Sequence, residues 1–151
     1  MALIAPALYD RLVALRRELH RYPELSRQEA RTAEVISRFL QDLGIHHRTN
    51  IAGYGVVADI PGDSGVPCVV LRADMDALPI QEETGLEFAS VHGGVMHACG
   101  HDGHTTMLLG AAALLSLVFF GDRSTKITAT CPKCKTTYQR YSIEGGSPRR
   151  L

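Results

Sequence analysis

The chain has 151 residues, a formal net charge of zero, 45% hydrophobic residues and 21% charged residues. These values predict one soluble globular domain and imply no nucleic-acid or membrane partner. The four cysteines are not spaced like a secreted disulfide framework, and no signal peptide is recognisable, so the expected location is the cytoplasm.

Two helices are expected first. Leucines repeat at helical spacing near the N-terminus, at Leu8, Leu12, Leu15 and Leu19. Pro23 is expected to end this helix. A second helix is expected over residues 26–44, because Ser26 and Glu29 have capping-box spacing and Gly44 suits a C-cap. Its apolar stripe consists of Ala33, Ile36, Leu40 and Leu43.

Strands are expected next, followed by a third helix. Residues 55–60 and 67–74 are rich in valine and bounded by glycine and proline. The second run is nearly continuous in apolar residues, which predicts a strand buried on both faces, with Cys68 as a small core residue. Residues 105–120 are apolar on all sides, which predicts a fully buried helix too short to span a bilayer. This order of elements predicts an α/β fold.

Residue usage changes near residue 120. Residues 1–120 contain nine arginines, no lysine and fourteen acidic residues, a net charge of −5, whereas residues 121–151 carry seven basic and two acidic residues, a net charge of +5. The change indicates a domain boundary, a disordered basic tail or a join between unrelated coding sequences.

Two carboxylates follow the second predicted strand. Asp74 and Asp76 lie where that strand ends, and ligands usually bind at the carboxyl ends of strands in α/β sheets. Strand alternation places both side chains on one side if the strand runs that far. The alternative is that they are two solvated loop carboxylates.

The stretch "HACGHDGHT", residues 97–105, concentrates metal-ligand side chains. Its candidate residues are His97, Cys99, His101, Asp102 and His104. Gly100 lets the backbone turn so that Cys99 and His101 can reach one ion, and thiolate with imidazole suits zinc or another late divalent metal. The alternatives are an accidental cluster or histidines that cap the following helix.

Three motifs in order resemble a known family. "RRELHRYPELSRQE", "VVLRADMDALPIQEETGLEFAS" and "GVMHACGHDGHTTMLLGAAALL" are similar to the N-terminal part of the metal-dependent amidohydrolases related to aminoacylases. These include hippurate hydrolases, N-acyl-amino-acid amidohydrolases and indole-3-acetyl-amino-acid hydrolases. The resemblance runs from about residue 7 to about residue 116. It implies a zinc-peptidase-like α/β catalytic domain with a small inserted domain for dimerisation or lid closure.

The resemblance also implies roles for single residues. Cys99 and His101 would ligate the metals, and Asp76 would lie beside the metal centre without binding the ions itself. Asp74, Asp102 and His104 are candidates for supporting roles on the ground of their residue types alone, since the family does not use them as its main ligands. The complete site would hold two divalent cations, zinc, manganese or cobalt, and hydrolyse the amide of a small N-acyl amino acid. The full-length form is expected to be a homodimer.

The chain departs from the family after residue 115. The family's next motif is a Glu-Glu pair, one the general base and the other a metal ligand, and two ligand histidines follow. Residues 116–151 contain only Asp122 and Glu144 as acids and no histidine. We therefore expect residues 1–116 to be the N-terminal portion of the catalytic domain, with an incomplete sheet and little or no activity. Residues 117–151 are expected to be an unrelated, poorly ordered basic tail.

The predicted tail contains a pair of cysteines. Cys131 and Cys134 form a single C-x-x-C, which is half of a zinc ribbon without its second pair. Free thiols in a poorly ordered tail are the favoured interpretation. The alternative function is a complete, non-catalytic zinc-binding or interaction module, in which these thiols join Cys99 and His101 or a partner chain.

Overall fold

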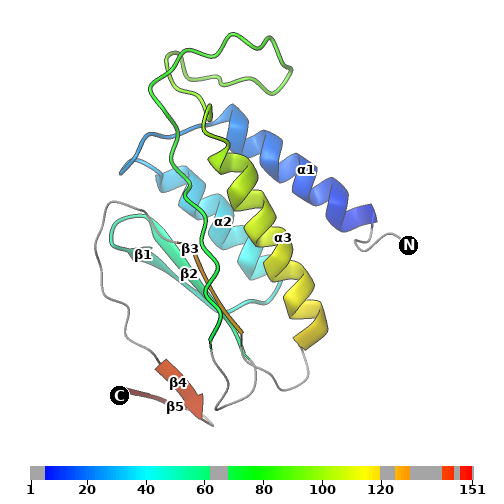
Figure 1. Cartoon of the computed structure of the whole chain (residues 1–151), viewed down its shortest axis with the longest axis vertical. Helices are drawn as coiled ribbons and strands as arrows, with labels where there is room; N and C mark the ends of the chain where they lie inside the picture. Colours follow the sequence, from blue (N-terminus) through cyan, green and yellow to red (C-terminus); the bar gives the residue numbers. More distant parts are fainter. Residues whose placement is uncertain (1–5, 62–67, 120–124, 130–140, 145–146, 151) are drawn as a thin grey trace.

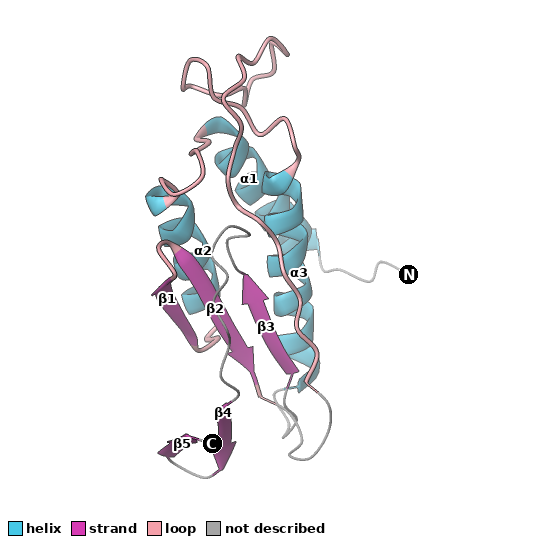
Figure 2. Ribbon diagram, turned by 60° about the vertical axis from the view of Figure 1, so that its left-hand side comes forward, coloured by secondary structure: helices cyan, strands magenta, loops and turns pink. Residues whose placement is uncertain are grey.

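A computed structural model describes residues 6–61, 68–119, 125–129, 141–144 and 147–150 (Figure 1). Its elements are α1 (Pro6–Arg21), α2 (Ala30–Asp42), β1 (His47–Ile51), β2 (Gly55–Ile60), α3 (His101–Phe119), β3 (Thr125–Ala129), β4 (Tyr141–Glu144) and β5 (Ser147–Arg150). Helices α2 and α3 cover one face of a three-stranded sheet, and α1 packs against α3 (Figures 1 and 2). The α/β architecture predicted from the sequence is confirmed.

Helix α1 follows the predicted leucine stripe. Leu15 and Leu19 are buried, and Leu8 and Leu12 pack half-buried against the same core. Gly110 of α3 permits close packing here, since a Cβ at that position would lie 3.0 Å from Leu12 Cδ1. The side of α1 that faces α3 is therefore set by its apolar spacing.

The start of α2 differs from the predicted capping box. Ser26 Oγ and Glu29 Oε1 are buried and have no hydrogen-bond partner among the described residues. Instead, the carboxylate of Glu24 accepts hydrogen bonds from the backbone amides of Arg31, at 3.1 Å, and Thr32, at 2.8 Å. Glu24 thus satisfies helix-terminal amides that the local motif was expected to satisfy.

The predicted glycine C-cap of α2 is confirmed. Gly44 has φ +68°, and its amide donates to Gln41 O at 2.9 Å. The amide of Ile45 donates to Leu40 O, also at 2.9 Å, which completes a Schellman motif. The left-handed backbone explains the preference for glycine here.

The sheet has the order β1-β2-β3 with β2 in the centre. Strand β2 pairs antiparallel with β1, with His47 opposite Ala58, and antiparallel with β3, with Val56 opposite Ala129. Strands β4 and β5 form a separate two-stranded sheet. Residues 125–129 therefore add a third strand to the sheet, although they lie beyond the expected domain boundary at residue 116. The domain boundary itself remains a prediction.

The strand predicted over residues 67–74 was wrong for the part that the structure describes. Residues 68–74 run alongside α3 and belong to no strand (Figure 2). Cys68 is exposed, and Val69 and Val70 are 56% and 60% exposed, so Cys68 is not a core residue. Strand β2 is paired on both sides, with β1 and β3, so residues 68–74 have no place beside it, and they join neither sheet in the described part of the chain. Residues 62–67, which include the first residue of the predicted strand, lie outside the described part of the chain.

Helix α3 is buried on one side only, which corrects the expectation of a fully buried helix. Leu109, Ala112 and Ala113 are buried, but Met107 is 65% exposed. The Thr105 hydroxyl donates to Asp74 O at 3.0 Å and ties the helix to the extended segment beside it. No helix in the described part of the chain is long and apolar enough to cross a membrane.

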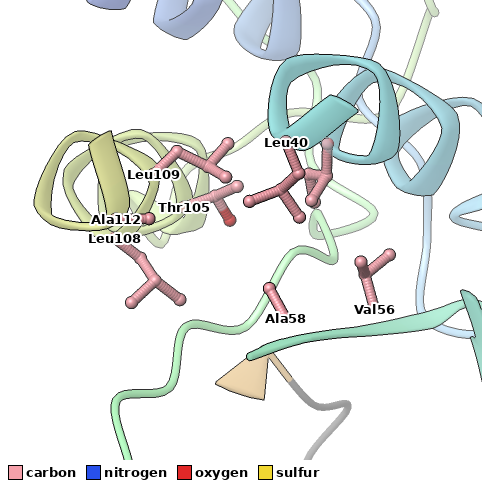
Figure 3. A pocket seen from close by; sticks show the side chains of 8 residues that line it. Leu40, Val56, Ala58, Thr105, Leu108, Leu109 and Ala112 are labelled. Carbon is pink, nitrogen blue, oxygen red and sulfur yellow. The ribbon is translucent and has the colours of Figure 1, made fainter. Parts of the chain in front are cut away.

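A small apolar cavity lies between α2, α3 and β2 (Figure 3). It has a volume of about 20 Å³ and is lined by Ile36, Leu40, Val56, Ala58, Thr105, Leu108, Leu109 and Ala112. Thr105 supplies the single polar side chain in this lining, too few partners for a stable buried water. The cavity is a packing gap, and the candidate chemistry lies elsewhere.

Candidate metal centre

The segments carrying Asp76 and Cys99 meet at a short antiparallel bridge. Leu78 and Met96 exchange two backbone hydrogen bonds, of 2.9 and 3.0 Å. The chain then turns at Gly100, which has φ +80°, and α3 begins at the next residue. The bridge and the glycine turn together place the "CGH" motif next to the end of the extended segment.

Three of the predicted site residues converge here. His101 Nδ1 lies 2.9 Å from Asp76 Oδ1 and 3.0 Å from the Asp76 carbonyl oxygen. The thiol of Cys99 donates to that same carbonyl oxygen at 3.7 Å. A carboxylate on Nδ1 fixes the proton there and leaves Nε2 as a metal-binding lone pair, the arrangement common to zinc-bound histidines.

The donor set fits part of a metal site. One thiol and one imidazole lie beside the same carbonyl oxygen, and Cys99 is a free cysteine. A catalytic zinc takes three protein ligands. No group of three or more His, Cys, Asp or Glu side chains able to hold a metal ion is found among the described residues. Further ligands would have to come from elsewhere.

Other predicted site residues do not join this pair. Asp74 and Asp76 are both half-buried between buried neighbours, as alternation predicts, but the Asp74 carboxylate pairs with Arg72 Nη2 at 2.8 Å. His104 is exposed, with its ring centroid 5.8 Å from that of His101. Cys131 and Cys134 lie outside the described residues.

Asp102, at the start of α3, contacts side chains of α1 and not the Cys99–His101 pair. Asp102 is 1% exposed, and its Oδ2 accepts hydrogen bonds from His20 Nδ1 at 2.7 Å and from Arg16 Nε at 3.0 Å. Its carbonyl oxygen accepts from the Thr106 hydroxyl. The negative charge also suits the N-terminus of a helix. Asp102 therefore links α3 to α1.

His97 is buried directly before the motif. It is 3% exposed, and neither ring nitrogen has a hydrogen-bond partner among the described residues. Burial lowers the pKa of His97 to about 4, and the charge of Asp102 offsets this only in part. The ring is thus neutral at pH 7.

The sequence did not point to His20, which contacts Asp102, or to Glu82, which contacts His20. His20 lies just before Pro23, near the expected end of the first helix, and Glu82 sits in a polar loop beside Glu83, with nothing to mark either residue. In the structure, His20 Nε2 lies 3.1 Å from Glu82 Oε1, and both side chains are almost fully buried. Phe88 of the same loop packs edge-on against the His20 ring at 5.7 Å. No local pattern could have paired these residues, because they are far apart in the sequence.

Glu82 is held as a carboxylate. Burial alone would raise its pKa, but hydrogen bonds from the Thr84 hydroxyl, the Ser90 amide and His20 lower the pKa below the usual 4.5. A folded-state pKa below the unfolded one stabilises the fold above pH 4.5, and this contribution is lost as the pH falls through the folded-state value.

We therefore expect Glu82→Gln to lower the free energy of unfolding by about 1 kcal/mol at pH 7. The difference from wild type should shrink as the pH falls below 4.5. Urea unfolding in steps from pH 7 to pH 3 measures it. The neighbouring Glu83→Gln, at an exposed position, is the matched control. A difference that stays constant over this range would contradict the ionised role of Glu82.

Comparison with known proteins shows what this chain is similar to. Residues 70–125 match Peptidase family M20/M25/M40. The chain is 55% identical over 108 residues to the N-acetyl-L-cysteine deacetylase of Bacillus subtilis, which covers 72% of this chain and 26% of that protein. It is 51% identical over 105 residues to the N-acyl-L-amino acid amidohydrolase of Geobacillus stearothermophilus, covering 70% and 28%. The predicted resemblance to amidohydrolases of N-acyl amino acids is thus confirmed.

Solved structures agree with this relationship. The YXEP protein of Bacillus subtilis, described as a dinuclear metal binding peptidase from the M20 family, superposes with a TM-score of 0.79 at 41% identity, covering 85% of this chain and 36% of that one. A putative aminohydrolase from methicillin-resistant Staphylococcus aureus gives 0.72 at 40% identity, covering 82% and 32%. The chain spans about a quarter of the length of the curated relatives above.

Proposed function

We propose that this chain supplies part of the metal centre of an amidohydrolase that cleaves the amide bond of small N-acyl amino acids. The observation that carries the proposal is the convergence of Cys99 and His101 on Asp76. Two of the similar proteins, a deacetylase of N-acetyl-L-cysteine and an amidohydrolase of N-acyl-L-amino acids, support the substrate class.

Cys99 and His101 would hold the metal, and Asp76 would orient the His101 ring through Nδ1. Divalent cations, when bound, activate a water molecule and polarise the amide carbonyl. A thiolate with an imidazole suits zinc and cobalt, and manganese is a further cation that the resemblance implies for the complete site. The remaining ligands and the general base correspond to the Glu-Glu pair and the later histidines that the resemblance implies. A cytoplasmic homodimer is the proposed full-length form.

The isolated chain is proposed to have little or no amidase activity. Residues 116–151 carry only Asp122 and Glu144 as acids. Loss of a general base alone costs on the order of a hundredfold in rate, and missing metal ligands add to this. The function proposed here is therefore that of the whole enzyme, to which this chain contributes two ligands.

Cobalt binding tests the metal centre directly. Titration of the purified chain with Co²⁺ should produce a thiolate-to-cobalt charge-transfer absorption, because a thiolate ligand binds late divalent metals. Cys99→Ser should abolish this absorption, and His101→Ala should weaken binding. Cys68→Ser is the matched control, since Cys68 is exposed and distant in sequence from the motif.

The tail cysteines are tested in the same titration. The double variant Cys131→Ser/Cys134→Ser should keep the absorption if Cys99 is the thiolate ligand. Absorption that survives Cys99→Ser and disappears in the double variant would contradict the proposal and favour a zinc-binding module built on the tail.

A further inference from the structure

A buried histidine connects the metal-binding motif to two other parts of the chain. His20, near the end of α1, lies between two carboxylates, with Nδ1 2.7 Å from Asp102 Oδ2 and Nε2 3.1 Å from Glu82 Oε1. The side chains of His20, Asp102 and Glu82 are 4%, 0% and 2% exposed. Burying such polar groups is costly unless each is paired, so this bridge is a specific tertiary contact.

The two ends of the bridge hold different structures. Through Asp102, His20 holds the first turn of α3, which begins at His101. Through Glu82, it holds the loop over residues 80–95. That loop is also attached by Phe88, whose ring packs near the guanidinium groups of Arg16, at 5.2 Å, and Arg17, at 5.1 Å. The loop therefore has contacts with α1 that do not depend on Glu82.

The orientation of the first turn of α3 decides where His101 points. Asp76 and Asp74 hold the turn from one side, through His101 and Thr105, and Asp102 attaches it to α1, where His20 and Arg16 both contact Oδ2. The Cα atoms of a helix lie on a cylinder of radius about 2.3 Å, so a rotation of about 10° moves each one by about 0.4 Å. Metal–ligand distances tolerate only about 0.2 Å.

We propose that His20 is a positioning residue for the metal centre, which acts by fixing Asp102 and thereby the direction of the His101 ring. This rests on the proposed function, because it takes Cys99 and His101 as metal ligands. The contact with Glu82 anchors the loop and has no part in positioning the ligands.

Two substitutions, His20→Asn and His20→Gln, allow the two hydrogen bonds of His20 to be tested one at a time. The side-chain amide of asparagine places a donor near the position of Nδ1, so His20→Asn keeps the bond to Asp102 and loses the one to Glu82. The longer glutamine places its amide near Nε2, so His20→Gln keeps the bond to Glu82 and loses the one to Asp102. Each variant loses one buried hydrogen bond, so their stabilities should fall by similar amounts.

The experiment is a Co²⁺ titration of the full chain followed through the thiolate absorption, with thermal unfolding of the metal-free protein measured in parallel. His20→Gln should lower the Co²⁺ affinity by about tenfold, at the lower end of the effect of residues that orient metal ligands. His20→Asn should keep a Co²⁺ affinity within about threefold of wild type. Its loss of thermal stability should equal that of His20→Gln. Glu82→Gln should be destabilised with the affinity unchanged.

Equal affinities for the two His20 variants would overturn the positioning role while leaving the metal centre intact. Absence of the thiolate absorption in wild type would overturn the metal centre and the positioning role together. Should either His20 variant fail to fold, Glu82→Gln decides the matter. If the Co²⁺ affinity of Glu82→Gln falls together with its thermal stability, the proposal is overturned. If its stability falls and its Co²⁺ affinity stays at the wild-type value, the proposal is supported.

Discussion

Replacing Asp102 by alanine is expected to lower the free energy of unfolding by about 3–5 kcal/mol, as removing one partner of a buried ion pair usually does. The carboxylate is fully buried and accepts from both His20 and Arg16. Arg16 is 37% exposed and can turn to water, but His20 is 4% exposed and cannot. The change would leave a buried Nδ1 without a partner and would remove the charge that suits the start of α3.

Urea unfolding at pH 7 measures this effect. Asp42→Ala is the matched control, because Asp42 also forms an ion pair with an arginine of α1, Arg11, at 2.9 Å. That pair is about half exposed, so its loss should cost less than about 1 kcal/mol. Similar costs for the two variants would mean that the buried carboxylate adds nothing beyond an ordinary surface pair.

The features that local sequence predicted are those whose cause is local. The leucine stripe of α1 and the glycine cap of α2 depend on residues within a few positions of each other, and both are confirmed. The turn at Gly100 also follows from its own short stretch, although α3 begins at His101, four residues before the start predicted at residue 105. In each case the spacing of a few residues fixes the geometry.

The features that sequence missed depend on distant partners. The valines at positions 69 and 70 have strand composition, but whether they pair depends on which strands occupy the edges of β2. The cap of α2 comes from Glu24 rather than from the motif at Ser26 and Glu29. His20 meets Asp102 across 82 positions and Glu82 across 62 positions. Only the tertiary fold brings such side chains together.

Replacing Asp76 by alanine is expected to weaken metal binding by about 10- to 100-fold, the usual cost of losing the carboxylate behind a ligand histidine. Asp76 Oδ1 lies 2.9 Å from His101 Nδ1. Without it, the ring keeps only the Asp76 carbonyl oxygen at 3.0 Å, which fixes the same tautomer but carries no charge. The Co²⁺ titration measures the change, and the thiolate absorption should persist at saturating metal because Cys99 is untouched.

Asp74→Ala is the matched control for this prediction. Asp74 lies two positions earlier on the same extended segment and is half-buried like Asp76, but its carboxylate faces Arg72. The Asp74→Ala variant should therefore keep a Co²⁺ affinity within about threefold of wild type, because the Asp74 carboxylate does not touch a metal-binding residue. Equal losses in the two variants would show that the negative charge of the segment attracts the cation. A loss confined to Asp76→Ala would show that the orientation of His101 controls the affinity.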